Sequence, residues 1–229
     1  MSCTVPVTAD PNTVAVFEGL PELFSHLLHS YGKRNWWPAK SPFEMMVGAI
    51  LTQNTAWGNV ERAIDSFGEC LTPQFILSCE DSRLGEIIRP SGYYNQKAAR
   101  LKTLARWFEG YGFDIGRVRA MPAELLRAEL LALNGVGHET AYCLLLYAFD
   151  KPFFVVDAYT RRLFSRLGFS VPKEYDAFRC TIEASLPKEL YLYNEFHALI
   201  VQHAKERCRA KPVCAGCPLL ERCGYPGRG

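Results

Sequence analysis

The sequence predicts an all-α protein, and three observations carry that prediction. Hydrophobic residues make up 48% of the 229-residue chain, which suffices for a packed core and excludes a disordered protein. Apolar side chains recur at i, i+3, i+4 and i+7 in segment after segment, which is the spacing of one face of a helix. One short run, PFFVV at residues 152–156, looks like a strand, but a run of that length can equally be a buried connection.

The helical spacing recurs in five segments along the chain. The first runs from Phe24 to Tyr31 and ends where Gly32 follows, as helices commonly do. The others carry their apolar faces at residues 43–51, 60–67, 101–108 and 196–203. Prolines at positions 38, 90, 122 and 187 mark breaks between helices.

The chain shows no pattern of a membrane or secreted protein. Its longest apolar runs, such as AYCLLLYAF at residues 141–149, fall far short of the roughly 20 residues that span a bilayer. The N-terminus has no basic segment that leads into an apolar one. We therefore expect a protein with no membrane contact.

The last segment holds the most specific pattern, four cysteines spaced C-x5-C-x2-C-x5-C. Free cysteines favour apolar surroundings, whereas these lie among Arg, Lys and Pro, so we expect them to bind one structural metal centre in a reducing compartment. Zinc and an iron–sulfur cluster both accept four thiolates, and the spacing alone leaves both open. The four ligands would be Cys208, Cys214, Cys217 and Cys223.

Charge is also concentrated in this segment. The net charge of +2 does not by itself indicate nucleic-acid binding, but residues 205–229 hold six basic and two acidic residues. A loop fixed by a metal centre would present Arg207, Arg209 and Lys211 as a rigid array that suits phosphates. A solvated basic surface is an equally good interpretation of the sequence.

The stretch LNGVGHETA, residues 133–141, predicts a four-residue turn between two helices. Gly135 and Gly137 permit a positive φ and a close backbone approach, with Val136 between them. The amides of such a turn and the start of the second helix can bind a phosphate oxygen. An ordinary helical hairpin with a glycine cap has the same pattern.

Asp157 stands where the apolar run PFFVV meets a new amphipathic segment. A helix N-cap is the commonest use of aspartate at such a junction. A carboxylate at a helix start behind an apolar wall would also stay ionised, so it could stabilise a sugar cation or activate water.

Taken in order, LNGVGHETA, VVDAYTRR and the four-cysteine loop resemble the helix-hairpin-helix DNA glycosylase superfamily, on its endonuclease III side. LTQNT (51–55), GYYNQKAARL (92–101) and EFHALIVQHAKERC (195–208) match it in the same order. The resemblance implies a central helical barrel at residues 34–151 and a second domain from both termini, residues 1–33 and 152–229. The second domain would carry a 4Fe-4S cluster, with zinc as the alternative. The first cysteine gap is five residues here and usually six in the family.

The resemblance also implies partners and a location. The protein would be a monomer in a prokaryotic cytoplasm, associated with the nucleoid when bound to DNA. Double-stranded DNA with a damaged base would lie across the cleft between the two domains. The hairpin amides and the basic residues Arg209 and Lys211 would hold its phosphates.

The activity that the resemblance implies is hydrolysis of an N-glycosidic bond in DNA after the nucleotide has left the base stack. Gln53, with Asn54 beside it, matches the residue that fills the vacated space. Asp157 matches the aspartate that supports an oxocarbenium-like transition state. Glu139 stands where strand-cutting members have a nucleophilic lysine, and glutamate cannot form a Schiff base. We therefore expect a monofunctional enzyme, although Glu139 also suits a solvated first helical turn.

The substrate prediction rests on aromatic residues near the start of the barrel. The chain holds four tryptophans, and three of them, with an adjacent proline, cluster as Trp36, Trp37, Pro38 and Trp57. Flat aromatic walls favour a positively charged N-alkylated purine over its neutral parent. The NWWP and LTQNT pair is similar to the 3-methyladenine glycosylase branch. The alternatives are a pyrimidine-damage or mismatch glycosylase with lyase activity and a non-catalytic iron–sulfur protein that binds DNA.

Overall fold

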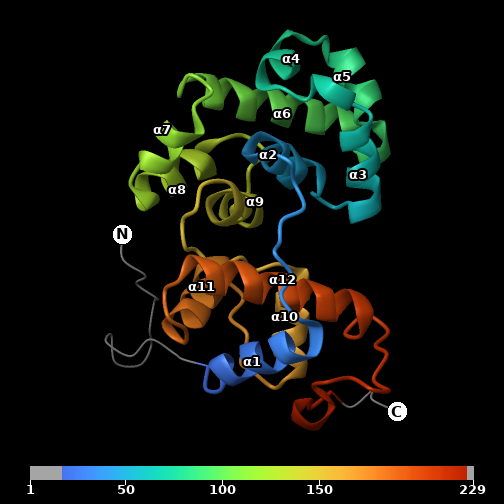
Figure 1. The fold of residues 1–229 in the computed structure, drawn as a ribbon, viewed down its shortest axis with the longest axis vertical. Helices are drawn as coiled ribbons and strands as arrows, with labels where there is room; N and C mark the ends of the chain where they lie inside the picture. Colours follow the sequence, from blue (N-terminus) through green and yellow to red (C-terminus); the bar gives the residue numbers. More distant parts are fainter. Residues whose placement is uncertain (1–16, 226–229) are drawn as a thin grey trace. The chain divides into compact units, whose positions relative to one another are not determined.

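The computed structural model describes residues 17–225. Within this range helices are the regular secondary structure and no strand is present, which confirms the predicted all-α fold (Figure 1). The parts of the predicted terminal domain at residues 1–16 and 226–229 lie outside the described range. The run at residues 152–156 is a buried connection without strand pairing, the second of the two interpretations that its sequence allowed.

The described residues divide into two compact units. The barrel unit is Trp37–Lys151, and the terminal unit is built from chain segments on either side of it, residues 17–36 and 152–225. Within the described residues, no helix is long and apolar enough to cross a membrane.

Helix α6 is the longest helix of the barrel unit and packs against α2, α4 and α5 (Figure 1). Local capping explains several starts: the Ser41 hydroxyl accepts from the Glu44 amide at the start of α2, and Thr72 does the same for Phe75 in α4. The elements are α2 (Pro42–Leu51), α3 (Trp57–Asp65), η1 (Gly68–Cys70), α4 (Pro73–Ser78), α5 (Asp81–Ile87), η2 (Arg89–Ser91), α6 (Tyr94–Glu109), α7 (Ile115–Ala120), α8 (Ala123–Ala132), α9 (His138–Cys143) and η3 (Leu144–Ala148).

Helix α12 organises the terminal unit, since both α1 and α10 pack against it. Aromatic side chains fill the core, where Phe17 and Phe178 both contact Phe164 with ring centroids less than 6 Å apart. The elements are α1 (Leu20–Tyr31), α10 (Ala158–Arg166), α11 (Tyr175–Ala184), α12 (Leu190–Glu206) and η4 (Leu220–Arg222).

Candidate functional site

The predicted hairpin is formed by α8, a turn and α9. Gly135 uses the positive φ that glycine permits, at 84°, whereas Gly137 has φ −85° and forms the extended N-cap of α9. Gly135 is needed for a second reason: a Cβ there would lie 2.4 Å from Cγ of Arg100. Between the two glycines, the side chain of Val136 is buried.

The LTQNT turn is bonded directly to this hairpin. The Gln53 amide nitrogen donates to the Gly135 carbonyl (3.0 Å) and to the Thr140 hydroxyl (2.9 Å). Its amide oxygen accepts from Arg100 at 2.5 Å. Asn54 is exposed and holds φ 51°, a conformation that asparagine tolerates better than most residues. The two segments singled out in the sequence are thus one bonded structure within the barrel unit.

The buried Lys97 side chain donates hydrogen bonds to the LTQNT turn. Only 1% of it is exposed, and its Nζ donates to the carbonyls of Leu51 and Ser91 (both 2.7 Å) and to the Thr55 hydroxyl (2.6 Å). Burial, followed by the charge of Arg100, lowers the pKa of Lys97 to about 8. The ammonium therefore remains mostly protonated at neutral pH and can use all three donors. Nothing in the sequence separates Lys97 from an ordinary surface lysine on α6.

A Lys97→Met variant is expected to unfold at a lower urea concentration, with about 2–4 kcal/mol lost from the free energy of unfolding. Methionine fits the buried stem, but the carbonyls of Leu51 and Ser91 lose their charged donor. Lys102→Met is the matched control on α6, since Lys102 pairs with the exposed Asp81 and should contribute less than about 1 kcal/mol. If the two variants unfolded at the same urea midpoint, this role for Lys97 would be contradicted.

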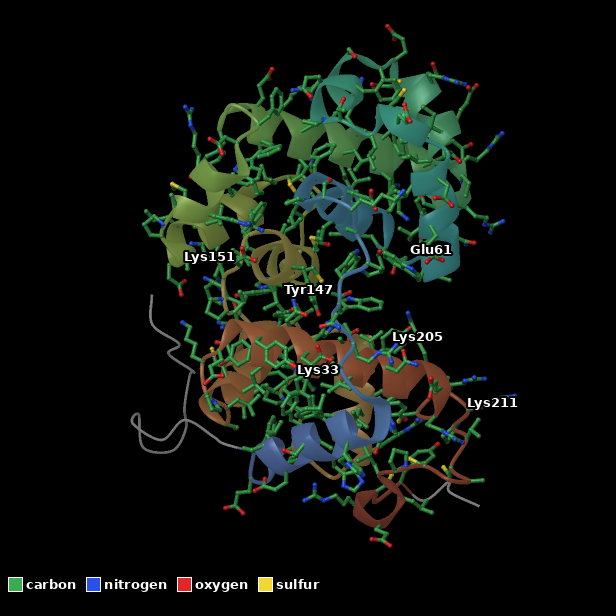
Figure 2. All side chains as sticks on the ribbon, viewed as in Figure 1. Lys33, Glu61, Tyr147, Lys151, Lys205 and Lys211 are labelled. Carbon is green, nitrogen blue, oxygen red and sulfur yellow. The ribbon has the colours of Figure 1, made fainter. Side chains whose placement is uncertain are left out.

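Three aromatic rings from separate elements of the barrel unit pack together. The Trp37 ring lies 5.1 Å from that of Trp57 in an edge-on arrangement and 5.4 Å from that of Tyr147. The Trp57 indole nitrogen donates to a Glu61 carboxylate oxygen at 2.7 Å, and Figure 2 labels Glu61 and Tyr147. We call Trp37, Trp57 and Tyr147 the aromatic cluster; each is partly exposed.

The sequence reasoning missed Tyr147, which η3 presents. This element is a π-helix that continues α9, where the pattern predicts an ordinary helix. Such π-turns are often found at functional sites. The available signal was an aromatic residue four positions after Cys143. A buried core helix would show the same spacing.

Trp36 belongs to the other unit, although it is adjacent to Trp37 in the chain. Its ring lies beneath the Lys205 ammonium, with Nζ 5.4 Å from the ring centroid. The buried Glu195 carboxylate fixes the preceding backbone by accepting from the amides of Arg34 and Asn35. The two tryptophans therefore have different neighbours, while Pro38 is exposed.

Glu139 lies in the first turn of α9 and is exposed. A carboxylate at this end of a helix interacts favourably with the helix dipole. The side chain has no amine, so this position offers no group that could form a Schiff base with a sugar.

Asp157 is the N-cap of α10 in the terminal unit, and its two carboxylate oxygens have different surroundings. Oδ1 accepts from the amide (2.7 Å) and the hydroxyl (2.8 Å) of Thr160. Oδ2 lies 3.6 Å from Nε2 of His197. Burial alone would raise the pKa of Asp157, but His197 and then the Thr160 hydrogen bonds outweigh it and hold that pKa below its usual value. Asp157 is therefore ionised at neutral pH, and capping occupies only one of its oxygens.

The four cysteines of the C-terminal segment line one cavity of the terminal unit, whose wall also includes Leu163 and Leu219. Four thiols around a space that Arg166, Arg207 and His203 also line are a suitable donor set for a metal centre. Within the described residues, no three His, Cys, Asp or Glu side chains are arranged to hold a single metal ion.

Two arginines near the C-terminal end of helix α10 donate hydrogen bonds to the cysteine loop. Arg162 donates to the Cys208 carbonyl at 2.7 Å, and Arg166 donates to the carbonyls of Arg209 (2.6 Å) and Ala210 (3.0 Å). One helix therefore carries Asp157 at its start and the loop at its end. The predicted phosphate contacts Arg209 and Lys211 are both exposed on this loop, and Figure 2 labels Lys211.

Comparison with known proteins gives consistent results. The model of a family described as "HhH-GPD superfamily base excision DNA repair protein" matches residues 47–188. A protein of Methanocaldococcus jannaschii with the provisional name DNA repair glycosylase MJ1434 is 49% identical over 212 residues, which cover 90% of this chain and 96% of that protein. Endonuclease III of Thermotoga maritima is 32% identical and covers 80% of this chain and 83% of its own length.

Two solved structures of DNA glycosylases and endonucleases are similar to this chain. The Helicobacter pylori 3-methyladenine DNA glycosylase MagIII, bound to 1,N6-ethenoadenine, is 28% identical with a TM-score of 0.68, and covers 80% of this chain and 96% of its own. An endonuclease III trapped in a covalent DNA intermediate has a TM-score of 0.76 at 24% identity, with 89% and 93% covered. At 24% identity, the similarity to this endonuclease III structure shows the fold alone.

Proposed function

Since the chain belongs to the HhH-GPD superfamily of base excision DNA repair proteins, we propose that it is a monofunctional glycosylase that hydrolyses alkylated purines from DNA. The predicted family is confirmed by the matched family model and by the relatives. The observation that carries the proposed chemistry is Asp157, a carboxylate that stays ionised although it is largely buried. A fixed negative charge of this kind stabilises the positive charge that develops on the sugar as the base departs.

Glu139 supports hydrolysis without strand cutting. A lyase reaction needs an amine that attacks the sugar carbon and forms a Schiff base, and a carboxylate lacks the nitrogen for that bond. Water then supplies the oxygen that replaces the base, and Asp157 is the group that would stabilise the sugar cation and orient that water.

The proposed DNA contacts lie mainly on the barrel unit. The turn amides at residues 135–137 suit a phosphate oxygen, and the LTQNT turn is tied to them through Gln53. Asn54 is exposed on this turn, so it is available to the space that the flipped nucleotide leaves. Gln53 would have to exchange its hydrogen bonds to Gly135, Thr140 and Arg100 to enter that space. Exposed Arg209 and Lys211 would add phosphate contacts from the cysteine loop.

The aromatic cluster supports the choice of an alkylated purine. N-alkylation gives the purine ring a positive charge, and electron-rich aromatic faces attract such a ring more than a neutral base. In addition, a charged base is a good leaving group and needs little acid catalysis. The similarity to a solved 3-methyladenine glycosylase agrees with this substrate class.

For the cysteine loop we propose a 4Fe-4S cluster held by Cys208, Cys214, Cys217 and Cys223. The four thiols line one cavity of the terminal unit, and four thiolates suit either zinc or a cluster. The resemblance of this loop to the endonuclease III side of the family favours the cluster, which would brace the loop. Broad visible absorption of the purified protein, with iron and sulfide present, would support the cluster; a colourless protein that contains zinc would contradict it.

A pyrimidine glycosylase with lyase activity is the second candidate function, because relatives at about 30% identity are endonuclease III enzymes. A non-catalytic iron–sulfur protein that binds DNA is the third. Both share the fold and the hairpin with the proposed function, so the reaction products, or their absence, distinguish the three.

An excision assay on a panel of duplexes separates these functions. We expect release of 3-methyladenine from methylated DNA and little release from duplexes with an oxidised or mismatched pyrimidine. Release of pyrimidines alone would contradict the proposed substrate class, and no release from any duplex would favour the non-catalytic alternative. An Asp157→Asn protein in parallel controls for a contaminating glycosylase.

A further inference from the structure

His197 is the side chain that faces the second oxygen of Asp157. It lies on α12, is only 4% exposed, and places Nε2 at 3.6 Å from Oδ2. The edge-on ring of Phe154 packs beside it at 6.4 Å between centroids. Because Thr160 already occupies Oδ1, Oδ2 is the oxygen left for the substrate, and His197 borders it.

We propose that His197 is a positioning residue for base excision, which in its neutral form directs its Nε2 hydrogen at Oδ2 and keeps the Asp157 carboxylate oriented. This inference rests on the proposed glycosylase function. A largely buried carboxylate needs polar partners to remain charged, and a neutral N–H donor supplies one without cancelling its charge. The separation exceeds a full hydrogen bond, and catalytic contacts of this kind are often long in a free enzyme and shorten when substrate binds.

The neutral form matters because protonation would reverse the effect. An imidazolium beside Asp157 forms an ion pair with it, so less of the negative charge remains to stabilise the sugar cation. It would also place a positive charge next to the positive charge that develops on the sugar. Protonation of His197 is therefore expected to slow base release, which would appear as an acid limb in the pH–rate profile.

Other ionisable groups surround this pair. Tyr193 lies one turn earlier on α12, and Glu183 on α11 accepts from the Phe154 amide at 2.8 Å. Glu183 is in turn paired with Arg179 at 2.6 Å, so its charge is partly compensated. Asp157 approaches from the start of α10 and places Oδ2 at 3.6 Å from Nε2 of His197.

The test compares His197→Gln and His197→Leu in single-turnover base release across pH. Glutamine places an amide nitrogen where Nε2 lies but does not titrate. We expect it to lower the rate at pH 8 by less than about tenfold and to abolish the acid limb, whereas leucine lowers the rate by about 10²-fold. His29→Gln, an exposed substitution on α1, should keep both the rate and the limb. A wild-type acid limb in His197→Gln, or a wild-type rate in His197→Leu, would overturn the inference.

An NMR titration of the His197 imidazole tests the pairing without substrate. The titration midpoint should move to lower pH in Asp157→Asn, because the variant loses the carboxylate that attracts the proton. An unchanged midpoint would refute the pairing even if base excision is observed. A shifted midpoint in a protein that releases no base would instead contradict the proposed function and leave the pairing in place.

Discussion

Replacing Asp157 by asparagine is expected to lower the rate of base release by about 10²- to 10³-fold, the loss typical when one preorganised charge is removed from a transition state. The amide has the shape of the carboxylate but no charge to set against the sugar cation. Its oxygen can still accept from the Thr160 amide, and asparagine is as good an N-cap as aspartate. The loss should therefore appear in chemistry and not in folding.

Single-turnover excision and thermal unfolding measured on the same preparations separate these effects. Asp157→Ala serves as the contrast, because it loses both the charge and the cap and should also be less stable by about 1 kcal/mol. If Asp157→Asn excised bases at nearly the wild-type rate, another group would have to carry the transition-state charge.

Gly135→Ala is expected to weaken binding to duplex DNA by at least about tenfold, which corresponds to about 1.4 kcal/mol. Alanine at φ 84° is itself strained by about 1–2 kcal/mol. In addition, its Cβ would meet Arg100 at 2.4 Å, and Arg100 is the donor to Gln53. Relief of the clash must move either the turn or Arg100, and both movements disturb the proposed phosphate site.

Gly137→Ala is the matched control for Gly135, two residues away in the same turn. Gly137 has φ −85°, and nothing lies within 4 Å of a Cβ built there. Affinity measured by fluorescence anisotropy at one fixed salt concentration should therefore change little. Equal losses in the two variants would show that the turn needs glycine for a reason other than backbone conformation and Arg100.

The sequence predicted much of the fold because its signals are local. The first helix ends at Tyr31 just before Gly32, and the apolar faces at 43–51, 101–108 and 196–203 all lie within helices. Asp157 was interpreted either as a cap or as a functional carboxylate; the structure shows the cap at Oδ1, while Oδ2 faces His197. Both interpretations depend on a pattern of a few adjacent residues.

The remaining parts of the site depend on contacts between residues far apart in sequence. Gln53 bonds to Gly135, and His197 approaches Asp157 from 40 positions away; neither pairing leaves a local signature. Lys97 has the sequence context of a surface residue until the folded turn supplies its acceptors. Tyr147 depends on a π-helix, which a 3.6-residue period does not predict.

Hydrolysis and lyase chemistry are distinguished by counting free base and strand breaks together after incubation with a methylated duplex in the presence of borohydride. We predict release of 3-methyladenine, an unbroken strand carrying an abasic site, and no protein–DNA adduct, because Glu139 offers no amine. A borohydride-trapped adduct with strand cleavage would contradict the hydrolytic mechanism. Absence of any released purine would contradict the substrate class.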